Sequence, residues 1–239
     1  MPLGELGLRG SLEESARRSR EAAATLESTS DSYFLSYVLD NLAWGLAQLG
    51  DLAEAERTVR RAIAIARQHG HPYRSAVGSR ILASILRLQG DLLAADRILA
   101  ESDSLVTGLD DLLFGATWFA EWAVVAAGLG DIERARDLAA IALTKATQRA
   151  LSSVMGWALW AEGEVRLTAG EQAAGSFAKA LTSMGRHSFP LRRVEVLIGL
   201  ALAVDAPEIA AAAAAAAVAV RDQQHMVLPA GIAARLDEI

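Results

Sequence analysis

The chain repeats a glycine followed by an acidic residue at a fixed spacing of 40 residues. The pairs are Gly50-Asp51, Gly90-Asp91, Gly130-Asp131 and Gly170-Glu171, and Gly10-Ser11 extends the series one step earlier. A period of this size is typical of proteins built from stacked supersecondary units, each of which buries its apolar face against its neighbours. The spacing therefore predicts an array of repeats.

The residues around each pair predict two helices per repeat. Before Gly50 and after Asp51, apolar residues recur at three- and four-residue intervals, as on one face of a helix: Leu42, Leu46, Leu49, then Leu52, Ala55, Val59 and Ala62. Gly50 suits the left-handed residue that ends a helix, and Asp51 can cap the next helix. We expect a helix–turn–helix in each unit, with a short slip in the unit at Gly170.

The repeat predicts one domain over 1–239 and an all-α fold, a right-handed α-solenoid of stacked antiparallel helix pairs. A half unit at 10–30 is followed by units at about 32–69, 73–107, 111–149, 151–184 and 188–223 and by a capping helix at 228–238. Pro207 and Pro229 are expected to open the last two helices. Since the array begins in mid-repeat, we expect a fragment of a longer protein; the alternative is that the segment from Pro2 to Arg9 closes the array.

Composition excludes several classes of protein. The net charge of −6 argues against a direct nucleic-acid binder, and the absence of cysteine excludes disulfides and thiolate metal sites. The N-terminus lacks the basic and apolar regions of a signal peptide, and the most apolar stretches, 194–204 and 209–220, are too short to span a membrane. We therefore expect a soluble, cytoplasmic protein without a membrane segment.

The sequence carries no catalytic signature. It has no phosphate-binding loop, no dinucleotide fingerprint and no H-E-x-x-H motif. His69 and His71 flank Gly70 at a helix end without a carboxylate at ligand spacing, and Glu162 and Glu164 point to different sides of a helix. We expect a protein that is not an enzyme and that needs neither metal nor cofactor.

The repeat resembles the tetratricopeptide repeat. Its pattern of large, small and Gly-Asp positions is filled in order by Leu39, Leu42, Ala43, Leu46, Gly50-Asp51, Ala55, Val59 and Ala62. The usual repeat has about 34 residues, and the longer form is similar to helical-repeat regions of bacterial LuxR-type ATP-dependent transcription regulators. Some relatives hold a partner's terminal carboxylate with Lys and Asn, but the matching positions here are Asp40, Trp44, Arg80 and Ser84, so that partner class is not expected.

The resemblance implies a concave groove lined by the first helix of each pair. By this mapping the groove residues are Tyr37, Asp40, Asn41, Trp44, Gln48, Arg80, Ser84, Arg87, Glu121, Trp157, Trp160 and Glu164. For the three tryptophans, exposure in the groove is weighed against packing between helices, whereas Phe119 and Trp122 fall at core positions. Arg17, Arg18, Arg20, Arg57, Arg60 and Arg61 are expected on solvated faces, paired with glutamates by i, i+4 contacts.

Three functional hypotheses follow. The first is a non-catalytic scaffold that binds a protein or peptide in the groove, as a regulatory segment of a larger bacterial protein such as a transcription regulator. The second is an effector-sensing domain for a small molecule within a signalling ATPase or regulator, which needs an enclosed pocket. The third is self-association, in which the incomplete first unit pairs with a second copy to form a homodimer.

Overall fold

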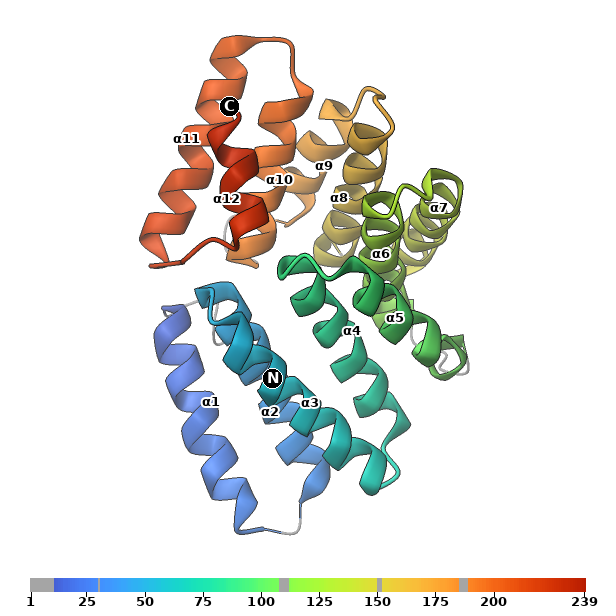
Figure 1. Ribbon diagram of the computed structural model, residues 1–239, viewed down its shortest axis with the longest axis vertical. Helices are drawn as coiled ribbons and strands as arrows, with labels where there is room; N and C mark the ends of the chain where they lie inside the picture. Colours follow the sequence, from blue (N-terminus) through green and yellow to red (C-terminus); the bar gives the residue numbers. More distant parts are fainter. Residues whose placement is uncertain (1–10, 30, 108–111, 150–151, 185–188) are drawn as a thin grey trace. The chain divides into compact units, whose positions relative to one another are not determined.

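A computed structural model describes residues 11–29, 31–107, 112–149, 152–184 and 189–239. Of these residues 85% lie in helices and none lies in a strand, so the all-α prediction is confirmed. Helices that follow one another along the chain pack side by side in pairs, as Figure 1 shows.

Contacts divide the described chain into two compact units, and each is treated by itself. Unit 1 contains α1 (Leu12–Glu27), α2 (Ser32–Leu49), α3 (Leu52–Gln68), α4 (Pro72–Leu88), α5 (Leu92–Thr107) and the segment Gln224–Pro229. Unit 2 contains α6 (Leu112–Gly128), α7 (Ile132–Arg149), α8 (Ser152–Thr168), α9 (Ala174–Met184), α10 (Pro190–Ala203), α11 (Pro207–Gln223) and α12 (Ala230–Asp237).

The repeated glycines end the first helix of their pairs in a left-handed conformation. Gly50, Gly90, Gly130 and Gly170 have φ values of 92°, 87°, 83° and 71°. At the first of these turns the Gly50 N–H donates to the carbonyl of Ala47 at 3.2 Å, and the Asp51 N–H donates to that of Leu46 at 3.0 Å. These two bonds satisfy carbonyls that a helix end leaves without a partner, so the turn predicted from the glycine is confirmed.

The aspartates after these glycines cap the second helices. The carboxylates of Asp51, Asp91 and Asp131 accept the backbone N–H three residues later, at 3.1, 3.0 and 3.3 Å. At the fourth turn α9 begins only at Ala174, and the carboxylate of Glu171 pairs with Arg136 instead. The slip expected in this unit therefore coincides with the replacement of the capping aspartate by a longer glutamate.

The core of unit 2 brings α8, α9 and α10 very close together around one aromatic ring. Phe177 of α9 is fully buried. A Cβ atom added to Gly163 or Gly199 would lie 2.7 or 2.5 Å from a carbon of this ring. Glycine is therefore required at both positions by the close approach of the ring, and both lie inside helices where glycine is otherwise unfavourable.

The last helices begin where the prolines predict. α11 begins at Pro207, α12 begins at Ala230 directly after Pro229, and the residues of α11 that are buried are Ala213 and Ala217. The alanine-rich helix thus packs through a thin stripe of methyl groups. In the part of the chain that the structure describes, no helix has both the length and the apolar character needed to cross a membrane.

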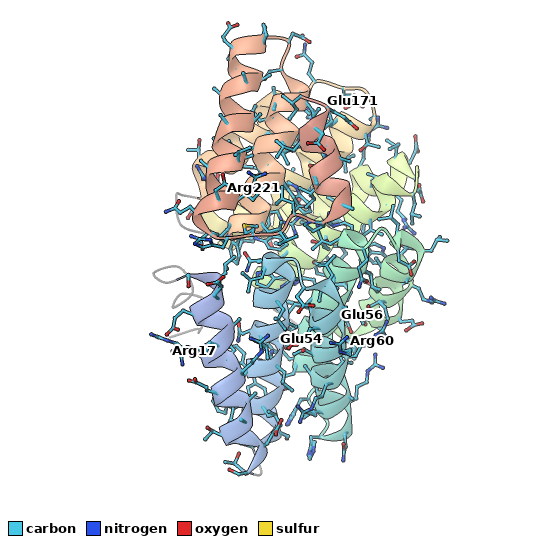
Figure 2. All side chains as sticks on the ribbon, turned by 60° about the vertical axis from the view of Figure 1, so that its left-hand side comes forward. Arg17, Glu54, Glu56, Arg60, Glu171 and Arg221 are labelled. Atoms are coloured by element: carbon cyan, nitrogen blue, oxygen red, sulfur yellow. The ribbon has the colours of Figure 1, made fainter. Side chains whose placement is uncertain are left out.

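Surface arginines pair with glutamates within helices, as predicted. Arg18 and Arg60 contact Glu14 and Glu56, four residues earlier, at 2.6 and 2.9 Å, and Figure 2 shows the second pair on α3. Hydrogen bonds from Arg17 and Arg18 lower the pKa of the partly exposed Glu14 to about 2.

Two further ion pairs join α1 to α3. Arg20 contacts Glu54 at 3.2 Å, and Arg61 contacts Glu27 at 2.8 Å. For these two arginines the predicted pairing within one helix is wrong, because neither has a carboxylate four residues away in its own helix and the other helix supplies one.

Candidate functional site

The predicted groove residues lie on helices of both units. Tyr37, Asp40, Asn41, Trp44 and Gln48 are on α2, and Arg80, Ser84 and Arg87 are on α4, all in unit 1. Glu121 is on α6, and Trp157, Trp160 and Glu164 are on α8, in unit 2. Each unit holds one buried cluster of charged and aromatic side chains on these helices.

The cluster of unit 1 is an ion pair between α2 and α4. The guanidinium of Arg74 donates a short hydrogen bond to the carboxylate of Asp40, and both side chains are buried. Gly78 of α4 lies close to this pair. A Cβ atom added to Gly78 would lie 3.2 Å from the second carboxylate oxygen of Asp40. Removing two charges from water is costly, so the pair is held by its direct contact.

Two tyrosines of α2 cover the buried guanidinium. The ring centroids of Tyr37 and Tyr33 lie 5.0 and 5.9 Å from the central carbon of Arg74. A cation near the face of an aromatic ring is attracted by the ring's quadrupole, and Arg is the residue most often found there. The ion pair and the rings together fix the orientation of α2 against α4.

Burial controls the protonation of Asp40. Desolvation raises the pKa of Asp40 to about 7, because it outweighs the attraction of Arg74 and Arg80 for the carboxylate. This buried acid is therefore poised to change its charge near neutral pH.

Around this pair, unit 1 presents a partly exposed set of predicted residues. Tyr37, Asn41, Trp44, Arg80 and Arg87 are neither buried nor fully exposed. The side-chain amide of Asn41 donates to the carbonyl of Tyr37 at 2.9 Å, one turn earlier on α2. Their assignment to a binding groove stays a prediction.

Asp40, Gln48 and Ser84 are buried in unit 1, which corrects their assignment to an exposed groove. Asp40 forms the ion pair with Arg74 described above. For Gln48 Oε1 and the Ser84 hydroxyl no hydrogen-bond partner is found among the described residues. These three side chains stabilise or line the interior and do not offer a contact surface.

The cluster of unit 2 is centred on Arg192 of α10. Its guanidinium contacts Glu121 of α6 at 2.9 Å and Glu195 of its own helix at 2.7 Å. The side chain of Arg192 is 1% exposed, and both glutamates are buried. Two carboxylates thus surround one buried cation, which satisfies several of its donors.

Trp157 and Trp160 stack on this guanidinium. The ring centroids of Trp160 and Trp157 lie 3.4 and 4.3 Å from the central carbon of Arg192. Trp157 is 3% exposed and Trp160 is fully buried, so of the two alternatives weighed for these tryptophans the structure has packing between helices.

The remaining predicted residues of unit 2, Glu121 and Glu164, also form ion pairs within the unit. Glu121 is fully buried by its contact with Arg192. Glu164 is buried and forms an ion pair with Arg235 of α12 at 3.0 Å. Their assignment to a groove is therefore corrected as well.

Arg74, Arg192 and Glu195 are among the site residues that sequence reasoning missed. Arg192 is followed by Arg193, which is only partly buried. Nothing in the local pattern separates the two arginines, although Glu195 three residues after Arg192 is the spacing of a helical ion pair. The apolar residues around them, Leu191, Val194 and Val196 to Ile198, indicate a buried helix but do not show which of the two arginines folds inward.

Two surface cavities lie within single units. In unit 1 a cavity of about 240 Å³ is bordered by α1, α2 and α3, with the ion pairs Arg20–Glu54 and Arg61–Glu27 at its rim. In unit 2 a cavity of about 710 Å³ is lined by residues of α8, α9 and the turn between α10 and α11, including Arg166, Lys179 and Asp205. Neither was predicted from the sequence.

The histidines form a small polar cluster at the start of α4. His71 lies 3.1 Å from the Ser32 hydroxyl, and its ring stacks at 6.4 Å from that of His69. No group of three or more His, Asp or Glu side chains within the described ranges could hold a metal ion.

No protein-family model matches the chain, and no curated protein matches it. Among solved structures, the apo form of RapI superposes with a TM-score of 0.68 at 12% identity, covering 99% of this chain and 97% of RapI. BtubC (BKLC) from P. vanneervenii superposes with a TM-score of 0.61 at 20% identity, covering 92% of this chain and 94% of BtubC. At such low identity the likeness shows the fold alone, and that fold is the helical repeat.

Proposed function

We propose that this chain is a non-catalytic scaffold that binds a protein or peptide on the face formed by α2 and α4 of unit 1. In this proposal it serves as a regulatory or interaction segment of a larger bacterial protein, such as a transcription regulator. The observation that carries the proposal is the set of partly exposed residues on these two helices, Tyr37, Asn41, Trp44, Arg80 and Arg87, which we call the α2–α4 face.

The chemistry of the α2–α4 face supports binding. Aromatic and arginine side chains supply most of the free energy at protein interfaces, above all where they stand near a buried centre. Trp44 offers an apolar anchor, and Arg80 and Arg87 offer positive charge, so the preferred ligand carries an apolar side chain near an acidic group.

The support beneath this face is rigid. α2 and α4 pack against each other and are tied by the buried ion pair between Asp40 and Arg74. A surface already ordered before binding loses little conformational entropy when a ligand arrives. The helical-repeat fold shared with RapI and BtubC agrees with a scaffold role, although neither comparison identifies a partner.

The test is peptide selection with the full-length chain. Peptides would be selected from a displayed random library, and their affinities would be measured by fluorescence polarisation with the wild type, Arg87→Ala and the control Arg97→Ala. Arg97 is an exposed arginine of α5, outside the α2–α4 face. We expect Arg87→Ala to weaken binding by about tenfold or more, as for an interface arginine, and Arg97→Ala to leave it unchanged.

Circular dichroism would first establish that both variants are folded as the wild type is. Selection of no acidic peptide, or equal binding by Arg87→Ala and wild type, would contradict the proposal. A lower affinity at higher salt would add support, because the arginine contribution is electrostatic.

A second candidate function is sensing of a small molecule in the cavity of unit 2. Its volume of about 710 Å³ lies in the range of ligand pockets although it is open to the surface, and Lys179 could hold an anionic group beside Arg166, which is paired with Glu162. Thermal-shift screening of anionic metabolites would test it. A ligand that raises the melting temperature of the wild type but not of Lys179→Ala would favour this candidate over the scaffold.

A further inference from the structure

One of the repeated glycine turns differs from the others in what lies against it. Of the five described glycines with positive φ, Gly70, Gly90, Gly130 and Gly170 have no atom within 4 Å of the position that a Cβ would take. At Gly50 the same position lies 2.3 Å from the carbonyl oxygen of Val227 and 2.8 Å from its Cβ. A distant segment of the chain therefore rests directly on this turn.

The contact includes a backbone hydrogen bond. The N–H of Val227 donates to the carbonyl of Leu49 at 3.2 Å. Leu49 is the last residue of α2, where helical carbonyls lack partners within their own helix. The segment thus satisfies an acceptor at the helix end, as an extended peptide ligand could.

The segment Gln224–Pro229 joins α11 to α12 through a turn at Gln224 and His225, and its last four residues lie outside any helix or turn. It contains no helix, and it belongs to unit 1 by its contacts although α11 and α12 on either side belong to unit 2. Met226 is 6% exposed and Pro229 is buried, whereas Val227 between them is 68% exposed. Leu228 is partly exposed, so the segment buries Met226 and Pro229 and exposes Val227.

We propose that the Gly50 turn is a binding site for non-helical apolar peptides and that Gln224–Pro229 occupies it as a ligand from the same chain. A partner segment of similar sequence, with an apolar residue a few positions before a proline, would compete for this binding site. A tethered segment acts at an effective concentration of about 1 mM, so it suppresses weaker competitors until it is displaced. The site is separate from the α2–α4 face, and either proposal can fail alone.

The experiment uses a fluorescein-labelled peptide of residues 222–231 and full-length variants, with binding read by fluorescence polarisation. Val227→Pro removes the N–H that donates to Leu49, and proline suits an extended segment. We expect this variant to bind the free peptide about tenfold more tightly than the wild type, because its own segment no longer holds the site.

The glycines supply matched controls. Adding Gly50→Ala to Val227→Pro places a methyl group where the peptide carbonyl lies and should abolish binding of the free peptide. Adding Gly90→Ala instead imposes the same backbone strain at φ 87° in open space and should leave binding intact. Binding that is lost equally with either alanine would overturn the proposal, as would a Val227→Pro chain that binds no more tightly than the wild type.

Hydrogen exchange gives an independent readout in single variants. In Gly50→Ala the amides of Met226 to Leu228 should exchange faster than in the wild type, whereas Gly90→Ala should leave them unchanged. Unchanged protection in Gly50→Ala would show that the segment does not depend on the turn and would also overturn the proposal. Arg87→Ala, which tests the α2–α4 face, should alter neither readout.

Discussion

At the scale of single residues, the two units use the same solution for buried charge. Asp40 of α2 and Glu121 of α6 are buried acids, and each is neutralised by an arginine from another helix that also contacts aromatic rings. A buried ion pair does not by itself add much stability, but removing one partner leaves an uncompensated charge. The behaviour of these acids is therefore the most direct test of the described side-chain positions.

The first prediction concerns pH. The folded pKa of Asp40, about 7, lies above its ordinary value of 3.8, so the folded state binds the proton more tightly than the unfolded state. Its contribution to the free energy of unfolding is fully present below about pH 4 and is lost as pH rises toward 7, with a slope of at most about 1.4 kcal/mol per pH unit.

Urea unfolding between pH 4.5 and 7.5 would measure this slope in the wild type and in Asp40→Asn, which has no titrating group at the position. The unfolding free energy of the wild type minus that of Asp40→Asn should fall as the pH rises from 4.5 to 7.5. A difference that stays constant over the range would show that Asp40 remains ionised beside Arg74.

The second prediction compares two glutamates that pair with arginine. Glu121→Gln weakens a fully buried pair and should lower the free energy of unfolding by about 2 kcal/mol, less than the loss of an unshared pair because Glu195 still contacts Arg192. Glu171→Gln alters the exposed pair with Arg136 and should cost less than about 1 kcal/mol. Chemical denaturation would measure both, and equal losses would contradict the assigned burial.

The sequence predicts on which helix each of these residues lies, but it does not predict its exposure. Helical periodicity and the repeat mapping assign Asp40, Trp157 and Trp160 to the first helices of their pairs, and the structure has them there. Their burial depends on arginines that are distant in sequence, 34 residues from Asp40 in one unit and 71 from Glu121 in the other. A short-range pattern contains no information about which arginine folds inward.

At the scale of helices and turns, the local signals are far more predictive. A left-handed glycine and a capping aspartate act over five or six residues, so Gly50-Asp51 and its equivalents could be placed from the sequence alone. The exception is Glu171, where the side chain is too long to form the same cap and α9 begins later.

The third prediction tests the packing of these helices. Gly163→Ala places a methyl group against the ring of Phe177 and should destabilise the protein by about 1–3 kcal/mol, even though alanine favours the helix. Gly175→Ala, in α9 with no atom within 4 Å, should be neutral or stabilising by up to about 1 kcal/mol. Thermal unfolding monitored by circular dichroism would rank the two variants, and a Gly163→Ala protein as stable as Gly175→Ala would refute the close approach.

At the scale of the whole molecule, the fold depends little on the identity of most residues. The chain shares only 12% and 20% of its residues with RapI and BtubC, yet the helical-repeat fold is common to all three. The division into two compact units could not be predicted, because the glycine spacing continues without change from Gly90 to Gly130.

The fourth prediction follows from this architecture. In a repeat protein each element is stabilised chiefly by its neighbours, so a local defect should loosen nearby helices first. Hydrogen exchange of Glu121→Gln should therefore increase in α6, α8 and α10 of unit 2 and change little in α2 and α3 of unit 1. A uniform increase along the chain would indicate a single cooperative structure instead.

The alanine stripe of α11 has a consequence for how exactly that helix is positioned. Its buried contacts are the methyl groups of Ala213 and Ala217, and the surrounding run from Ala210 to Ala217 consists of alanine throughout. A helix shifted by one residue along this run would present an equivalent face to α10. The register of α11 is thus nearly degenerate within the run, and the insertion or deletion of a single alanine there would be absorbed by a screw motion of the helix without loss of its packing surface.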